Sequence, residues 1–265
     1  MNGWLKREGG MMFPIEDGFV RLVDSMGDDN AVIRAARVSY GEESKGTDAD
    51  RKLIQYLMKH NHGTPFEHIV FTFHIRCPIF VARQWFRHRI GSFNEISGRY
   101  TELHTGFFVP TLLRQNKTSN HQASIEGDFT EDETESMMNE WKYTLDIVEA
   151  TYHSLLEKGL AREQARAILP LGTYTEFYWT VNLRSLFNFI RLRTSEDSQA
   201  EMRGYADIVK LIAEEKAPWS FEAFDKTNLN KGVSGISEVM EYTSLWLFNV
   251  FVIFMFGWFY FYFYS

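Results

Sequence analysis

The chain has 265 residues and a formal net charge of −7, and this length suffices for one sizeable core or two small ones. An acidic chain argues against broad nucleic-acid binding, because such binding needs a basic surface that displaces counterions. The single cysteine, Cys77, excludes an internal disulfide and favours a cytoplasmic protein. Residues 1–12 lack the apolar segment of a secretory signal.

Turn and capping signals divide the first part of the chain. A strand is expected to end at Gly27, where a cluster of Asp and Asn residues can begin a helix. Thr47 and Asp50 have the spacing of a capping box, so a second helix is predicted from Thr47 to about His60. The predicted order is a strand over 19–26, a helix over 31–39, a loop over 41–46, a helix over 47–60 and a turn over 62–65.

The next segment alternates between apolar and polar side chains, which is typical of a strand with one buried face. Its apolar positions are Ile69, Phe71, Phe73 and Ile75, and its polar positions are His68, Thr72, His74 and Arg76. Pro78 then begins a short helix over residues 79–86.

The second half reads as helices around one further strand. Residues 111–130 are polar and are expected to form a mobile loop, while Gly159 and Pro170 mark two helix ends. The predicted elements are helices over 131–157, 161–169, 181–193 and 199–216, with a strand over 173–180. We therefore expect a single α+β domain with a mixed, mainly antiparallel sheet and packed helices.

The carboxyl end differs from the rest of the chain. Residues 245–264 carry no charge and are long enough to span a bilayer, yet aromatic residues dominate where a spanning helix favours aliphatic ones. Three interpretations stay open: a non-native extension, a membrane anchor and a buried core segment. The expected organisation is a leader over 1–12, a domain over 13–228, a linker over 229–244 and an apolar tail over 245–265.

Residues 87–99 contain the most informative run of polar side chains. Arg87, His88 and Arg89 are adjacent, and neither a helix nor a strand can bury three consecutive side chains on one face. Arginine binds phosphate and carboxylate oxygens through two nitrogens, while Glu95 and Ser97 can hydrogen-bond to the edge of a heterocycle. The run predicts a loop that holds an anionic ligand; the alternative is a solvated basic turn.

The helix expected over 181–193 carries a second polar stripe. Arg184, Asn188 and Arg191 follow one another at helical spacing, beside an apolar stripe. No carboxylate occurs on that face before Glu196, so the arginines are expected to lack a partner and to suit a phosphate or a flavin. The alternative is the polar face of a surface helix.

The sequence gives little support for a metal site, a cysteine nucleophile or a dinucleotide-binding motif. His60, His62, Glu67 and His68 follow none of the usual metal-ligand spacings, so we expect no metal. Cys77 lies at a junction between a strand and a helix and is expected to be structural. The glycines contain no GxG pattern, so no Rossmann fingerprint is present.

The arginine-histidine-arginine run, followed after seven residues by Ser97, resembles the signature of the flavin-dependent thymidylate synthases. The resemblance covers about residues 17–225 and includes the turn over 62–68, the segment over 162–166 and the helix over 181–193. It implies the reductive methylation of dUMP to dTMP without an enzyme thiol nucleophile. Methylenetetrahydrofolate would supply the carbon, and FAD reduced by NADPH would supply the hydride. The implied assembly is a homotetramer in which each site is shared between subunits.

The resemblance also assigns roles to individual residues. Arg193 would be the catalytic group that polarises the pyrimidine of the nucleotide. The implied dUMP-binding residues are Gln84, Arg87, Glu95, Ile96, Ser97, Gly98, Arg99 and Arg166. The implied FAD-binding residues are Thr64 of a neighbouring subunit, Arg87, His88, Arg89, Glu95, Asn182, Arg184 and Asn188. The alternative function is a membrane-tethered nucleotide-binding protein without turnover, whose membrane contact would be residues 245–264.

Overall fold

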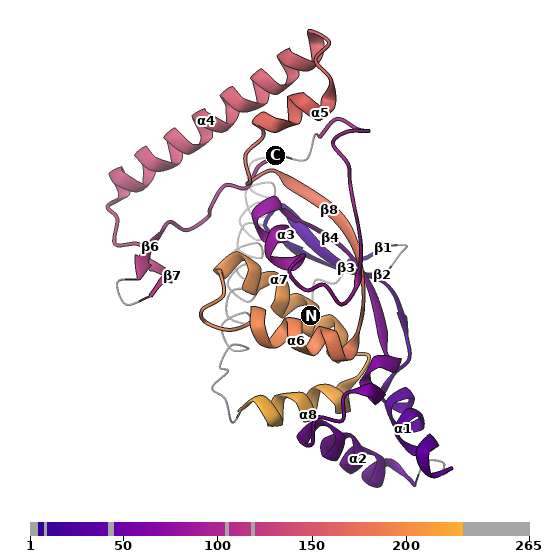
Figure 1. Cartoon of the computed structure of the whole chain (residues 1–265). Coiled ribbons are helices and arrows are strands. Elements are labelled where there is room, and N and C mark those ends of the chain that lie inside the picture. The colour runs from indigo at the N-terminus through magenta and orange to yellow at the C-terminus, as the bar shows by residue number, and fades with distance from the viewer. Residues whose placement is uncertain (1–4, 8–9, 42–44, 104–105, 118–119, 230–265) are drawn as a thin grey trace, which may run out of the picture.

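A computed structural model describes residues 5–7, 10–41, 45–103, 106–117 and 120–229 (Figure 1). The expected apolar tail, and the expected linker apart from Leu229, lie outside these described residues. Within the described ranges, no helix combines the length and the hydropathy that crossing a bilayer requires.

Six strands form one sheet in which every described pairing is antiparallel. The order across the sheet is β1 (Leu5–Arg7), β2 (Gly10–Ile15), β3 (Gly18–Met26), β4 (Val70–Pro78), β8 (Tyr174–Asn182) and β5 (Ser92–Glu95). The pairing of β4 with β8 runs from Val70 opposite Asn182 to Pro78 opposite Tyr174. The prediction of one α+β domain is confirmed, and so are the strands expected over 19–26, 69–76 and 173–180. The sheet was expected to be mixed, but its described strand pairs are all antiparallel.

The alternation along β4 places its apolar residues in the core. Phe71, Phe73 and Ile75 are fully buried, and they pack with Phe177 and Trp179 of β8. Burying a side chain of this size contributes about 1.5–3 kcal/mol. The two central strands therefore hold the core, and the segment that follows β4 starts from a fixed position.

The helices fall into three places around the sheet. Figure 1 shows α6 (Leu183–Arg193) and α7 (Ala200–Glu214) together, with α3 (Ile79–Trp85) beside the sheet. Contacts join α1 (Asp29–Arg37), α2 (Thr47–Lys59) and α8 (Pro218–Leu229) at one end of the molecule. At the other end lie α4 (Glu131–Glu157) and α5 (Arg162–Ala165), and α4 extends away from the sheet. Three short 3-10 turns complete the described chain: η1 (Val38–Tyr40), η2 (Thr64–His68) and η3 (Arg166–Ile168).

Several boundaries differ from those expected. The segment over 111–130 is not a loop throughout, because β6 (Arg114–Lys117) and β7 (Asn120–Glu126) pair as a hairpin. No helix was expected after Pro218, yet α8 begins there, since proline is well suited to the first turn of a helix. The single helix expected over 161–169 is divided into α5 and η3. β1 and the start of β2 lie in the expected leader.

The capping box expected at Thr47 is absent. Gly46 is the N-cap residue of α2, and no side chain caps this end of the helix. The carboxylate of Asp50 instead binds the guanidinium of Arg37 at 2.5 Å, and both side chains are buried. Asp50 also accepts a hydrogen bond from the backbone nitrogen of Lys45 at 3.4 Å. Its partners are therefore Arg37 and Lys45, and not Thr47 as the sequence spacing suggested.

Candidate active site

The helix α3 places the first candidate residues beside the sheet. Its buried side consists of Val81, Ala82 and Trp85. The Trp85 ring lies 4.9 Å from the Phe189 ring and 5.4 Å from that of Trp179. With this face held in the core, Arg83 on the helix and Arg87 and Arg89 in the turn after it are exposed to solvent.

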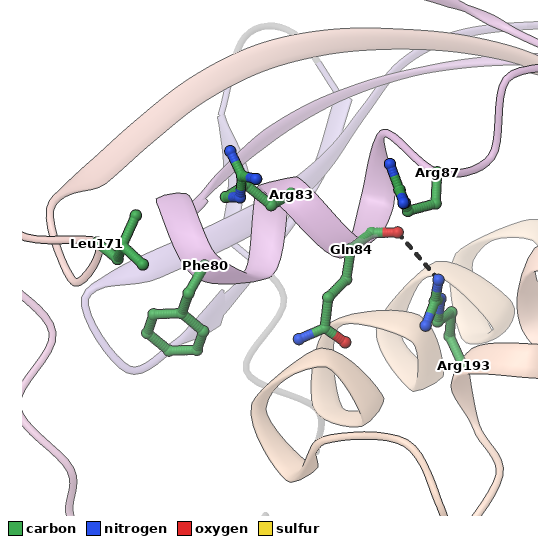
Figure 2. A pocket seen from close by; sticks show the side chains of 6 residues that line it. All are labelled: Phe80, Arg83, Gln84, Arg87, Leu171 and Arg193. Carbon is green, nitrogen blue, oxygen red and sulfur yellow. Dashed lines mark hydrogen bonds between the residues drawn. The ribbon is translucent and has the colours of Figure 1, made fainter. Parts of the chain in front are cut away.

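A cavity of about 470 Å³ opens beside α3 (Figure 2). We call it the arginine pocket, and it is lined by Phe80, Arg83, Gln84, Arg87, Leu171 and Arg193. The expected residues Gln84, Arg87 and Arg193 are thus brought together from α3, the following turn and the end of α6. Arg83 was not expected here, although its position one helical turn before Arg87 could have indicated it.

Two neutral acceptors hold the guanidinium of Arg193. Its Nε donates to Nε2 of His88 at 2.9 Å, and a terminal nitrogen donates to the carbonyl oxygen of Gln84 at 3.1 Å. Among the described residues no carboxylate forms an ion pair with Arg193. Burial lowers the pKa of Arg193 from its ordinary value, but an arginine in a protein stays protonated. Its charge is therefore fixed in position and not neutralised.

Arg87 also lines a second cavity of about 360 Å³, together with Phe86 and Arg89. None of the described carboxylates forms an ion pair with Arg87 or Arg89. Two arginines near an aromatic ring suit a ligand that combines phosphates with an aromatic system, since guanidinium groups bind phosphate oxygens and stack on rings. The donors present here therefore fit the diphosphate and ring system of FAD.

A second group of candidate residues lies where the chain leaves β5. It consists of Ser97, Gly98 and Arg99 together with Arg166 of η3, and we call it the serine loop. The carbonyl oxygen of Ser97 accepts from the backbone nitrogen of Tyr100 at 3.0 Å. A Cβ at Gly98 would lie 3.1 Å from Cδ of Arg166 and 2.8 Å from the side chain of Leu103, so glycine allows this close packing. Arg99 also reaches the α5 carboxylate of Glu163 at 3.4 Å.

Glu95 and Ile96 connect the serine loop to the sheet. The Glu95 carboxylate accepts a hydrogen bond from the hydroxyl of Thr175 on β8 at 2.7 Å. The backbone nitrogen of Ile96 donates to the carbonyl of Glu176 at 2.9 Å. Among the described residues, no hydrogen bond or ion pair links Ser97 or Arg166 to Arg193, and Figure 1 shows α5 well apart from α6.

The remaining candidates lie at η2 and along α6. Asn182 caps α6 by accepting from the backbone nitrogen of Ser185 at 2.9 Å. Asn188 accepts from Arg191 at 2.9 Å. Both asparagines therefore already have a structural hydrogen bond, and the exposed side chain of Thr64 lies on η2.

The expectation that Arg184 lacks a partner is wrong. Its guanidinium binds the carboxylate of Glu67 on η2 at 2.5 Å. A Cβ at Gly63 would lie 2.6 Å from Nε of Arg184, so the glycine makes room for this contact. The partner lies 117 positions away in the chain, which is why the search along one helix face did not find it.

Cys77 is fully buried at the end of β4. Burial, with a smaller contribution from Glu95, raises the pKa of its thiol well above the ordinary value. A thiol that is protonated and closed off from solvent is a poor nucleophile. The structural role expected for Cys77 agrees with this environment. Within the described ranges, no three His, Cys, Asp or Glu side chains are grouped in a way that could hold a metal ion.

Comparison with known proteins identifies relatives along most of the chain. Residues 21–219 match the family described as "Thymidylate synthase complementing protein". A flavin-dependent thymidylate synthase of Thermosipho africanus is 52% identical over 219 residues, covering 80% of this chain and 92% of that protein. One of Thermus thermophilus is 49% identical over 220 residues, covering 83% of this chain and 80% of that protein.

A solved structure shows the same fold. The UMP/dUMP methylase PolB from Streptomyces cacaoi, bound with 5-Br dUMP, matches with a TM-score of 0.72 and 37% identity. The match covers 79% of this chain and 95% of that one. These comparisons support an enzyme over a binding protein without turnover. The chain belongs to the flavin-dependent thymidylate synthases, which confirms the expected resemblance and the thymidylate synthase activity that it implies.

Proposed function

We propose that the chain converts dUMP to dTMP by reductive methylation in the cytoplasm. Methylenetetrahydrofolate is the carbon donor and FAD, reduced by NADPH, is the hydride donor. The observation that carries the proposal is the arginine pocket, where His88 and Gln84, and no carboxylate of the described residues, hold the charge of Arg193. The dUMP analogue bound to PolB supports a uracil nucleotide as the substrate.

Arg193 acts on the uracil ring. As C5 of the ring attacks the carbon donor, negative charge develops on the ring, and a fixed positive charge stabilises it. This polarisation makes C5 a better nucleophile without a covalent bond to the enzyme. The burial of Cys77 supports a reaction without an enzyme thiol, because that sulfur has no access to a substrate.

The nucleotide is held by two groups of residues from different subunits of a homotetramer. Gln84 and Arg87 belong to the arginine pocket and hold dUMP beside Arg193. The second group is Glu95, Ile96, Ser97, Gly98, Arg99 and Arg166. The separation of α5 from α6 in Figure 1 supports a shared site, because α5 leads directly into Arg166 and α6 ends at Arg193.

The FAD site uses residues from three parts of the chain. These residues are Thr64 from a neighbouring subunit, Arg87, His88, Arg89, Glu95, Asn182, Arg184 and Asn188. Arg87 and Arg89, which form no ion pair with a described carboxylate, bind phosphate oxygens. Arg184 exchanges Glu67 for the cofactor or binds beside it. FAD supplies the hydride for the methylation when it is bound. The contribution of the protein is to orient the nucleotide, exclude water and stabilise charge.

The test uses the purified full chain. We expect yellow protein with the absorption bands of oxidised flavin, tetrameric mass in solution, and dTMP formation that depends on methylenetetrahydrofolate and NADPH. The variant Arg166→Ala alone and the variant Arg193→Ala alone should each be nearly inactive, whereas mixed tetramers of the two should regain activity in sites built from intact halves. Colourless protein that binds dUMP without producing dTMP would contradict the proposed reaction.

We also propose that the catalytic domain ends near residue 228. All candidate residues lie between Thr64 and Arg193, and the last described helix, α8, ends at Leu229. A chain that stops after Leu229 should remain folded, yellow and active. Loss of flavin and of the folded state in this shortened protein would show that later residues complete the core.

A further inference from the structure

The hydrogen bond between Arg193 and His88 fixes the protonation of the imidazole. Arg193 can only donate hydrogen bonds, because its guanidinium has no acceptor atom. Nε2 of His88, which lies 2.9 Å from Nε of Arg193, must therefore carry a lone pair. The ring proton of His88 then resides on Nδ1, and the side chain is neutral.

The surroundings of His88 keep it neutral over the physiological range. Burial lowers its pKa to about 4, and the nearby charge of Arg193 acts in the same direction. The Phe189 ring meets the imidazole edge-on at 5.0 Å, and the backbone nitrogen of His88 donates to the carbonyl of Trp85 at 3.0 Å. Arg193, on α6, is the charged group that faces the imidazole. No described carboxylate on the elements packed against His88 offsets the effect of Arg193 on its pKa.

We propose that His88 is a positioning residue that orients the guanidinium of Arg193 by accepting its Nε hydrogen bond as a neutral group. The role rests on the proposed function, in which Arg193 polarises the uracil, and it is additional to the contact with FAD that the resemblance assigns to His88. A neutral acceptor fixes the direction of the guanidinium and leaves its whole charge for the substrate.

A carboxylate at this position would also orient Arg193, but with a different result. The pair would be a salt bridge, and the negative charge would offset the positive charge that the uracil ring needs. The need to orient Arg193 therefore does not by itself explain why position 88 is a histidine and not an acidic residue. The combination of a fixed guanidinium and an uncancelled charge is what a neutral imidazole provides.

Three substitutions separate position from charge. In His88→Gln the amide oxygen reaches about as far as Nε2 and can accept the same hydrogen bond. In His88→Asn the shorter side chain cannot reach Arg193, and in His88→Glu the acceptor returns with a negative charge. All three are compared with Arg193→Ala for flavin content, dUMP affinity, kcat and KM.

We expect kcat to fall by about 10- to 100-fold in His88→Asn, as is typical when a group that orients a reacting residue is lost. The kcat of His88→Gln should be roughly tenfold higher than that of His88→Asn, whereas the kcat of His88→Glu should be little higher than that of His88→Asn. The KM for dUMP should change less than kcat in each variant. Equal activity of the Gln and Glu variants would show that charge is irrelevant at this position and would overturn the proposal.

Nitrogen NMR of the imidazole gives a readout that does not depend on turnover or on bound flavin. Nε2 of His88 should be unprotonated and the ring should stay neutral until the pH falls to about 4, the pKa that its surroundings give it. In Arg193→Ala the pKa of His88 should rise, because the repulsion by the guanidinium is gone. An ordinary pKa for His88 in the unmodified protein, or no change in Arg193→Ala, would contradict the hydrogen bond.

The same set of variants distinguishes the role proposed for Arg193 from the role proposed for His88. Turnover by Arg193→Ala close to that of the unmodified enzyme would refute the role proposed for Arg193 itself. An inactive Arg193→Ala combined with an unimpaired His88→Asn would leave the role of Arg193 intact and overturn the one given to His88. If His88→Asn does not fold, the comparison of Gln with Glu and the NMR titration still decide.

Discussion

Two arginines with restricted access to water have opposite surroundings in this molecule. Arg37, in the corner formed by α1 and α2, is 7% exposed and binds the carboxylate of Asp50 at 2.5 Å. Arg193, at the end of α6, binds an imidazole and a backbone carbonyl and faces the arginine pocket. The first arginine has its charge neutralised within the fold, while the second keeps its charge for a ligand.

The difference shows how to tell a structural arginine from a functional one. Breaking a buried ion pair leaves a charge that the interior cannot solvate, so the first arrangement contributes to the integrity of the fold. An arginine that is oriented by neutral acceptors has its position fixed without a counter-charge, which is the arrangement that stabilises charge developing in a transition state. Substitutions at the two places should therefore change different quantities.

The largest effect is expected for Asp50→Ala. Removing this carboxylate breaks the buried ion pair of Arg37, which should lower the free energy of unfolding by about 3–5 kcal/mol. Denaturant unfolding measures the change, and Glu222→Ala is the matched control, because its ion pair with Arg51 is exposed and should contribute less than about 1 kcal/mol. A loss below 1 kcal/mol for Asp50→Ala would mean that Arg37 does not depend on this pair.

Arg193→Ala should change the rate of the reaction and leave the stability of the fold nearly unchanged. We expect dTMP formation to fall by about 10²–10³-fold, because one group that stabilises developing charge is lost, while the protein stays folded and yellow. Single-turnover measurement of dTMP checks the rate, and Arg51→Ala serves as an arginine control outside the pocket. Turnover within a few-fold of the unmodified enzyme would remove Arg193 from the catalytic role.

The sequence predicted best the elements that carry a strong local signal. The alternation from Ile69 to Ile75 placed β4 correctly, because a strand with one buried face leaves a period of two in the sequence. The helix over 131–157 was placed with its observed bounds, and Thr130 and Glu133 form its capping box. In both segments the local pattern, an alternation in one and a capping box in the other, is enough to set the structure.

Contacts between distant segments were the source of the errors. Asp50 and Glu67 bind arginines that lie on other elements, and no spacing along the chain records these pairs. No helix was expected after Pro218, although proline suits the first turn of a helix. The arginine pocket was predicted in part, since the motif indicated Arg87 and the resemblance indicated Arg193, whereas Arg83 entered only once the fold had placed it.

A smaller effect is expected for Arg83→Ala, which tests whether the arginine pocket extends beyond the residues that the resemblance assigned. Arg83 and Arg87 are like charges one helical turn apart, and an anion between them would relieve their repulsion. We expect the KM for dUMP to rise by about tenfold and kcat to change less, because an exposed charge-assisted hydrogen bond contributes on the order of 1.4 kcal/mol. An unchanged KM, with Arg51→Ala as the control, would restrict Arg83 to the rim of the cavity.

The smallest effect is expected for Cys77→Ala. Cys77 is a core residue and is part of neither the Arg37 ion pair nor the arginine pocket. Its side chain is fully buried beside the last residues of β4, and alanine removes one sulfur atom from that packing. The free energy of unfolding should fall by roughly 1 kcal/mol, the cost of leaving a small void. The rate of dTMP formation should stay within a few-fold of the unmodified enzyme, because no thiolate takes part. A folded Cys77→Ala protein that binds FAD and dUMP but forms no dTMP would require a thiol in the reaction, and the charge of Arg193 would then be insufficient to activate the uracil.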